Sequence, residues 1–101
     1  ETAVRLIQAM ASQEIVPGYR MRRSALAPVQ VGDLTVQLVA EYEGLAVVGR
    51  VVRIENSSSA PIEITEGRIA PSDALAVSIA NPKLAPRQAT SAYVVTGKEG
   101  S

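Results

Sequence analysis

The stretch from Gly49 to Ile64 constrains the fold more than any other, because it alternates apolar with other residues twice, with a break between. The first alternation includes Val52 and Ile54, and the second restarts at Ile62. Five polar or small residues and a proline separate them. A period of two is typical of β-strands, and proline is confined to strand starts and edges. The stretch therefore predicts two β-strands joined by a turn.

The length and composition favour one small β domain. The chain has 101 residues, of which 47% are apolar, and its only aromatic residues are three tyrosines. A core of Val, Ile, Leu and Ala suits a small sandwich and offers few platforms on which nucleic-acid bases could stack. Ten basic and ten acidic residues give a formal net charge of zero, so we expect no direct contact with nucleic acid.

The residue types that most enzymes and metal sites need are missing. The sequence has no Cys and no His, which removes disulfides, thiolate chemistry, the commonest general base and the commonest metal ligand. No apolar run approaches the roughly 20 residues of a membrane helix. We predict no catalysis, no cofactor and no metal, because the carboxylates are scattered: Glu41, Glu43, Glu55, Glu63, Glu66 and Asp73.

An amphipathic helix is predicted over residues 2–13, with Thr2 as its N-cap. Its apolar stripe has helical spacing and consists of Val4, Leu6, Ile7, Met10 and Ala11. Pro17 and Gly18 indicate a turn after it. We therefore assign residues 1–18 to a helix and turn that lead into the domain.

Strands account for most of the remaining chain. Leu34 to Tyr42 alternates, which places Leu34, Val36, Leu38, Ala40 and Tyr42 on one face. The return strand from Leu45 to Glu55 is nearly all apolar before Arg53, so we expect both of its faces to be covered. One further strand is expected to begin at Val29 or Val31. Three more are expected over Ile62–Thr65, Leu75–Ile79 and Thr90–Thr96, with loops over Gly67–Asp73 and Leu84–Gln88.

This pattern predicts an antiparallel β-sandwich of six to seven strands with one N-terminal α-helix. We place the sandwich at residues 19–97 and a frayed tail at 98–101. The chain starts at Glu1 and not at Met, and ends in Gly100 and Ser101, so we expect a fragment of a longer protein with a linker remnant at its end. Arg20, Arg22 and Arg23 are interpreted as a solvated strand face.

The serine-rich connection from Asn56 to Pro61 is interpreted as a solvent turn and not as an active site. Asn and Ser cap turns with their own side chains, and a serine nucleophile needs a base that the sequence does not supply. Asn56 also begins an Asn-Ser-Ser glycosylation sequon, to which we give little weight.

A β domain without a chemical site usually offers a surface to a partner. Either a sheet edge pairs with an incoming strand or another chain covers an apolar sheet face. The N-terminal helix and a partner protein are both candidates to cover the over-apolar strand. The candidate partner-binding residues are Val47, Val51, Leu34, Val36 and Tyr93.

Several stretches, which together cover nearly the whole chain in order, are familiar from one protein family. They are Leu6-Ile7-Gln8-Ala9-Met10, Val16-Pro17-Gly18-Tyr19, Arg53-Ile54-Glu55-Asn56, Pro61-Ile62-Glu63-Ile64, Leu75-Ala76-Val77, Leu84-Ala85-Pro86 and Ala92-Tyr93-Val94-Val95. In this order they resemble the C-terminal region of the TraK family, secretin-like proteins of the outer-membrane core complex in conjugative type IV secretion systems.

The resemblance implies a β-sandwich in the periplasm that belongs to a ring-shaped assembly and works by protein–protein interaction. It implies three partners: a TraV-type outer-membrane lipoprotein, a TraB-type scaffold and like subunits of the ring. Association with the outer membrane would then occur through partners, and the family implies no catalytic residue. The alternative is an immunoglobulin-like adhesion or ligand-binding domain, and an enzyme comes third.

Overall fold

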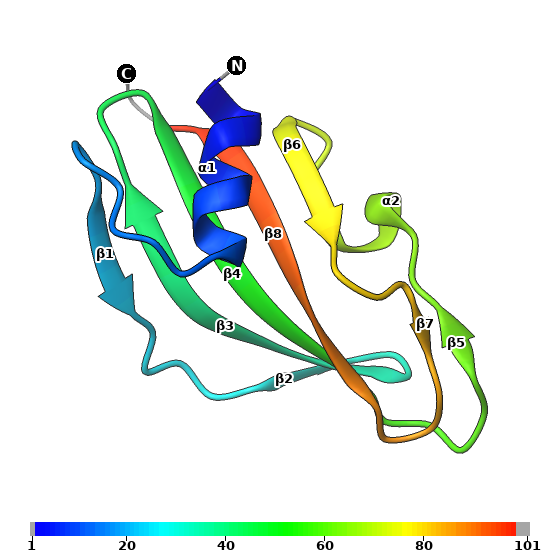
Figure 1. The fold of residues 1–101 in the computed structure, drawn as a ribbon. Coiled ribbons are helices and arrows are strands. Elements are labelled where there is room, and N and C mark those ends of the chain that lie inside the picture. The colour runs from blue at the N-terminus through cyan, green and yellow to red at the C-terminus, as the bar shows by residue number, and fades with distance from the viewer. Residues whose placement is uncertain (1, 99–101) are drawn as a thin grey trace.

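The computed structural model describes residues 2–98, which form eight strands and two helices (Figure 1). The elements are α1 (Thr2–Ala11), β1 (Arg20–Arg23), β2 (Val29–Val31), β3 (Leu34–Glu43), β4 (Val47–Asn56), β5 (Ile62–Glu63), α2 (Glu66–Ile69), β6 (Ala74–Ile79), β7 (Lys83–Leu84) and β8 (Ala89–Gly97). Residues 99–101 of the predicted frayed tail at 98–101 lie outside the described residues, as does the expected linker remnant. Lys98 still donates its amide to Ala46 O at 2.9 Å.

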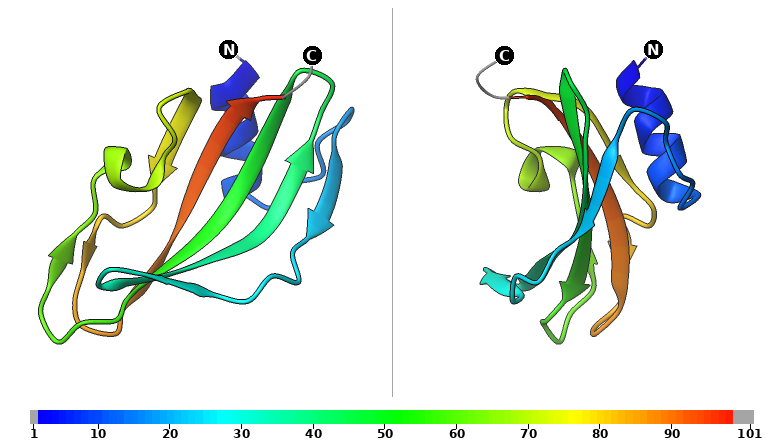
Figure 2. Two further views of the ribbon diagram at one scale, coloured as in Figure 1. Left: turned by 180° about the vertical axis from the view of Figure 1, so that it is seen from behind. Right: turned by 90° about the vertical axis from the view of Figure 1, so that its left-hand side faces the viewer.

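Six strands form one antiparallel sheet. Five of them lie in the order β1-β3-β4-β8-β6, and the sixth, β2, pairs with the part of β3 that β1 does not cover. The two short strands β5 and β7 pair with each other in a second, small sheet. Helix α1 lies on one face of the large sheet, and α2 lies on the other (Figure 2). We call these the α1 face and the α2 face. The predicted mainly β architecture with an N-terminal helix is confirmed.

Helix α1 ends at Ala11, well before Pro17, the residue from which the turn after the helix was predicted. Gln13 adopts φ 57°, its amide bonds to Met10 O, and the amide of Glu14 bonds to Ala9 O at 3.0 Å. These two bonds form the Schellman motif that closes many helices, here with Gln in the left-handed position that glycine prefers. The helix also begins at Thr2 itself, so Thr2 is its first residue and not a preceding cap.

A β-bulge in β3 divides the predicted single face into two. The pairing with β4 shifts between Leu38 and Ala40, so that Leu38 lies opposite Val52 while Ala40 lies opposite Val51. Leu34, Val36 and Leu38 therefore face α2, whereas Ala40 and Tyr42 face α1. The prediction that all five share one face is wrong, because the extra residue Val39 reverses the alternation.

The apolar strand β4 has a cover on each face, as predicted. On the α1 face, α1 packs on Val47, Val95 and Tyr42 through Ala3, Leu6 and Met10. On the α2 face, a second core joins sheet residues to the small sheet and α2; its buried members are Leu34, Ile54, Ile64, Leu84 and Ala92. One sheet thus serves two small cores, which explains why β4 needs apolar residues on both sides.

The approach of α1 to the sheet depends on Gly49. A Cβ at this position would lie 2.8 Å from Leu6 Cδ2 and 2.8 Å from Met10 Sδ. Contacts this short do not occur between real Cβ atoms and carbon, so a larger residue would displace the helix. The missing side chain lets α1 sit directly on β4.

Three connections differ from their predicted form. The predicted loop after Thr65 contains the single-turn helix α2, and the loop that begins at Leu84 contains β7, which pairs with β5. The turn from Asn56 is not simply a solvent turn, because Asn56 is completely buried. Its side-chain amide donates to the carbonyls of Ala60, Leu84 and Ala85 at 2.8, 3.1 and 3.2 Å. Asn56 is therefore a structural junction between the turn and β7.

Candidate interaction surfaces

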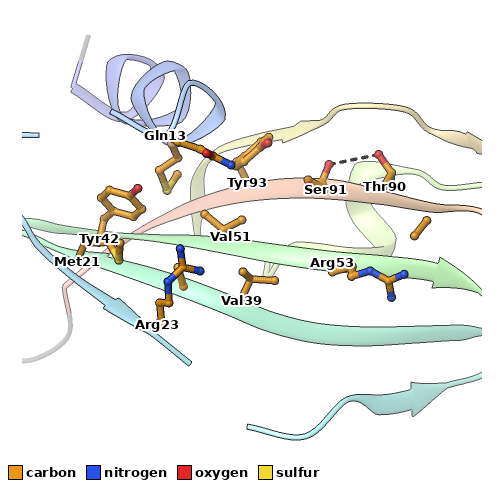
Figure 3. A pocket seen from close by; sticks show the side chains of 13 residues that line it. Gln13, Met21, Arg23, Val39, Tyr42, Val51, Arg53, Thr90, Ser91 and Tyr93 are labelled. Carbon is orange, nitrogen blue, oxygen red and sulfur yellow. Dashed lines mark hydrogen bonds between the residues drawn. The ribbon is translucent and has the colours of Figure 1, made fainter. Parts of the chain in front are cut away.

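A groove opens on the α1 face where the helix ends. It has a volume of about 530 Å³ and lies over β1, β3, β4 and β8 (Figure 3). Its lining consists of Met10, Gln13, Met21, Arg23, Val39, Ala40, Tyr42, Val51, Arg53, Ala89, Thr90, Ser91 and Tyr93. The groove exists because α1 covers only part of its face of the sheet, since the chain reverses at Gln13.

The lining of the groove combines an apolar floor with polar groups at its borders. Val39 and Val51 form part of the floor, and the bulge at Val39 turns the following residues of β3 into the groove. Arg23 and Arg53 bring two positive charges, and none of the lining residues in the described part of the chain is a carboxylate. Arg53 is held by Glu55 at 3.1 Å. Such a surface suits a partner that buries apolar groups and offers a negative charge to Arg23.

The five predicted site residues fall on three different surfaces. Val51 and Tyr93 line the groove together. Val47 lies beneath α1 with 7% of its surface exposed, so it contacts the helix and not solvent. Leu34 and Val36 lie on the opposite face. The structure thus brings two of the five into one open site.

Leu34 and Val36 line a smaller pocket on the α2 face. Its volume is about 190 Å³, and its other lining residues are Val31, Val52, Arg68, Ile69 and Val94. Arg68, which lines this pocket, forms an ion pair with Asp33, and the pair ties α2 to the turn before β3. The pocket is mostly apolar and is a second place where a side chain of a partner would fit.

Charged side chains cross the α2 face in a row. Glu41 of β3 accepts hydrogen bonds from Arg22 of β1 at 3.2 Å and from Arg50 of β4 at 3.1 Å. Arg50 also donates to Thr96 Oγ1 of β8 at 3.1 Å. Four neighbouring strands are thereby linked by polar groups. The side chains of both ion pairs are partly exposed, so each pair adds little to stability on its own.

A second pair lies beside this row. Lys98 Nζ contacts Glu43 Oε2 at 3.2 Å. The hydrogen bond and the charge of Lys98 hold the pKa of the Glu43 carboxyl below its ordinary value against the smaller, opposing effect of burial, and Arg22 and Arg20 lower it slightly further. Arg20 lies opposite Glu43 in the β1–β3 register.

The two ends of the large sheet differ in charge. The edge strand β1 reads Arg-Met-Arg-Arg and is exposed along its whole length, as the interpretation of a solvated strand face predicted. The edge strand β6 reads Ala-Leu-Ala-Val-Ser-Ile and carries no charge, and a register shift at Leu75 interrupts its pairing with β8. Charges and bulges are both devices that protect sheet edges from unspecific pairing.

Sequence reasoning identified the arginines of β1 but not their relation to Glu41 and Glu43. That relation depends on the β1–β3 register and on the bulge, neither of which the residue pattern reveals. It also did not identify Gln13 and Ser91 as groove residues, because polar residues at a helix end and in a strand have no distinctive spacing. Across residues 2–98, no group of three metal-ligating side chains is found, and neither helix is long and apolar enough to cross a membrane.

The fold and these surfaces define a class of small domain, in which a helix partly covers one face of an antiparallel sheet and leaves a groove and a charged edge exposed. The family model of the TraK C-terminal domain matches residues 1–96, and the chain belongs to this family. The resemblance to the TraK family is thereby confirmed, and it links the domain to conjugative type IV secretion. None of the curated proteins matches the chain.

Proposed function

We propose that the domain is a non-catalytic assembly module in the outer-membrane core complex of a conjugative type IV secretion system. In this proposal it lies in the periplasm, binds a TraV-type lipoprotein, a TraB-type scaffold and like subunits of the ring, and reaches the outer membrane through these partners. The single observation that carries the proposal is the open groove beside α1 in a chain that belongs to the TraK C-terminal family.

The groove has the properties that an interface core needs. Val39, Val51 and Tyr93 supply apolar surface, and Arg23 and Gln13 supply polar groups at its border. Buried apolar anchors within a polar border are the usual arrangement of binding energy in protein interfaces. A partner segment in this groove would also complete the cover that α1 leaves unfinished.

The test is an NMR titration of the isotope-labelled chain with a soluble form of the TraV-type lipoprotein from the same gene cluster. Replacing Ser91 with Trp fills the groove with a side chain that strands tolerate, while Ser59→Trp makes the same change on an exposed turn. We expect shifts at groove residues in the parent chain and in Ser59→Trp, and weaker binding by Ser91→Trp. Unchanged spectra in the parent chain would refute the lipoprotein assignment.

A further inference from the structure

The free edge of β1 carries an inference about the chemistry of a partner. We propose that this edge binds an extended segment of a partner protein that bears acidic side chains at two alternate positions, with an apolar residue between them. The inference rests on the proposed role as an assembly module and adds to it the site and the partner's chemistry.

The edge is open for strand addition. Strand β1 is the terminal strand of the sheet in the described residues, pairs only with β3, and all four of its residues are exposed. In an antiparallel pair, every second residue of a terminal strand directs its peptide N–H and C=O away from the sheet. An incoming extended segment can satisfy these groups by the ordinary strand-addition mode of peptide binding.

The charges on the α2 face determine which segment fits. Arg50, Glu41 and Arg22 alternate in sign across β4, β3 and β1, with contacts of 3.1 and 3.2 Å. The next row has the same order, since Lys98 contacts Glu43 at 3.2 Å and Arg20 lies opposite Glu43. Each row therefore ends in a cation at the sheet edge.

Arg20 and Arg22 are two residues apart in one strand and thus point to the same face. A strand added outside β1 would place two alternate side chains opposite them. Acidic side chains at these positions continue both rows with the correct sign, and cross-strand pairs of opposite charge are stabilising. The intervening side chain would lie on the α1 face beside Met21, which is 47% exposed. This favours an apolar residue between the two acids.

The same charges disfavour two other occupants. A second copy of β1 would place Arg against Arg, and like charges directly opposite one another are destabilising. Strand β6 of a neighbouring copy carries no charge, so it leaves Arg20 and Arg22 without new partners. The edge thereby selects an acidic strand from a different segment, since discrimination uses repulsion as well as attraction.

The test uses a short synthetic peptide that alternates Glu with Val, titrated into the isotope-labelled chain at low salt. The matched peptides carry Gln or Lys in place of Glu. Two double variants of equal net charge provide the comparison: Arg20→Glu with Arg22→Glu changes the α2 face of the edge, and Arg5→Glu with Lys83→Glu changes an exposed position of helix α1 and an exposed position of β7. Circular dichroism verifies that both fold, and an Arg20→Gln, Arg22→Gln variant replaces the first if it does not.

We expect the Glu peptide to shift the amide signals of β1 and the Gln and Lys peptides to do so weakly or not at all. The Arg20, Arg22 variant should bind the Glu peptide about tenfold more weakly than the Arg5, Lys83 variant does, because two attractive pairs become repulsive. It should bind the Lys peptide instead. Equal binding by the two variants, or shifts at β6 and not at β1, would overturn the inference.

The lipoprotein is titrated into the same three proteins in parallel, which separates the two proposals. If the lipoprotein binds the parent chain and the Glu peptide leaves β1 unchanged at millimolar concentration, the edge inference fails and the assembly role stands. If the lipoprotein does not bind and the Glu peptide does, the lipoprotein assignment fails and the edge chemistry stands.

Discussion

Replacing Asn56 with Ala should cost this domain a large share of its stability. Asn56 is 0% exposed and its side chain makes five hydrogen bonds. It donates to the carbonyls of Ala60, Leu84 and Ala85, and its Oδ1 accepts from the amide and hydroxyl of Ser58. No other described side chain connects the turn after β4 with β7 in this way.

The magnitude follows from which partners are left unsatisfied. The bond to Leu84 O is buried, and leaving such a group without a partner costs about 1–3 kcal/mol. The bonds to Ala60 and Ala85 are partly buried, so water can replace the amide, and each contributes about 0.5–1 kcal/mol. The sum is about 3 kcal/mol, against a total of roughly 5–15 kcal/mol for a typical domain.

The assay is thermal and urea unfolding of the Asn56→Ala chain followed by circular dichroism. A loss of about 3 kcal/mol corresponds to a Tm decrease of roughly 12–24 °C for a domain of this size. Asn81→Ala is the matched control, because Asn81 is exposed and its side chain accepts a single bond, from Lys83 N at 3.1 Å. If Asn56→Ala were no more destabilising than Asn81→Ala, the assignment of Asn56 as a structural junction would be refuted.

Three further predictions concern α1 and the charged row. Gly49→Ala should destabilise the chain by about 1–2 kcal/mol and increase amide exchange in α1. The control Gly97→Ala should be near neutral, because nothing lies within 4 Å of the new Cβ. Equal effects of the two substitutions would contradict the close contact of α1 with Gly49. Gln13→Gly should stabilise by up to about 1 kcal/mol, measured by urea unfolding, because glycine adopts φ 57° without strain. Lys98→Gln should raise the pKa of Glu43 in an NMR titration. Because folding lowers this pKa, the stabilisation that it represents is present at neutral pH and is lost as the pH falls through the folded-state pKa. An unchanged pKa of Glu43 in the variant would contradict the pairing with Lys98.

The strands were predictable because alternation and β-branched residues are local properties of the sequence. The apolar run in β4 even predicted covers on both faces, and the two cores supply them. Helix α1 was predictable from its apolar stripe. Its end was less so, because Gln13 closes the helix in a conformation that a glycine would have indicated in the sequence.

The division of β3 between two faces was not predictable from the alternation. Residues on either side of Val39 continue the same apolar–polar pattern, so the bulge leaves no mark in the sequence. Its consequences are large. It turns Tyr42 towards α1, and it places Glu41 on the α2 face, where Arg22 and Arg50 meet it. The groove and the charged row therefore both depend on a pairing detail between strands.

Of the two short strands β5 and β7, only β5 was predictable from the local sequence. Ile62 indicated a strand, but the segment at Leu84 is short and flanked by prolines, which is typical of a loop. Its pairing with β5 is imposed by burial of Leu84 in the second core and by the bond from Asn56 to Leu84 O at 3.1 Å. Tertiary contacts, not propensity, make this segment a strand.

The most direct test of the assembly role is photo-crosslinking in cells that carry the conjugative system. A photoreactive amino acid replaces Ser91 in the groove of the full-length protein, and the same residue replaces Ser59 on the exposed turn as a control. The proposed role predicts that position 91 crosslinks to the lipoprotein or to another subunit of the outer-membrane core, and that position 59 does so weakly. No crosslink from position 91 to any secretion component, in cells that transfer DNA normally, would contradict it.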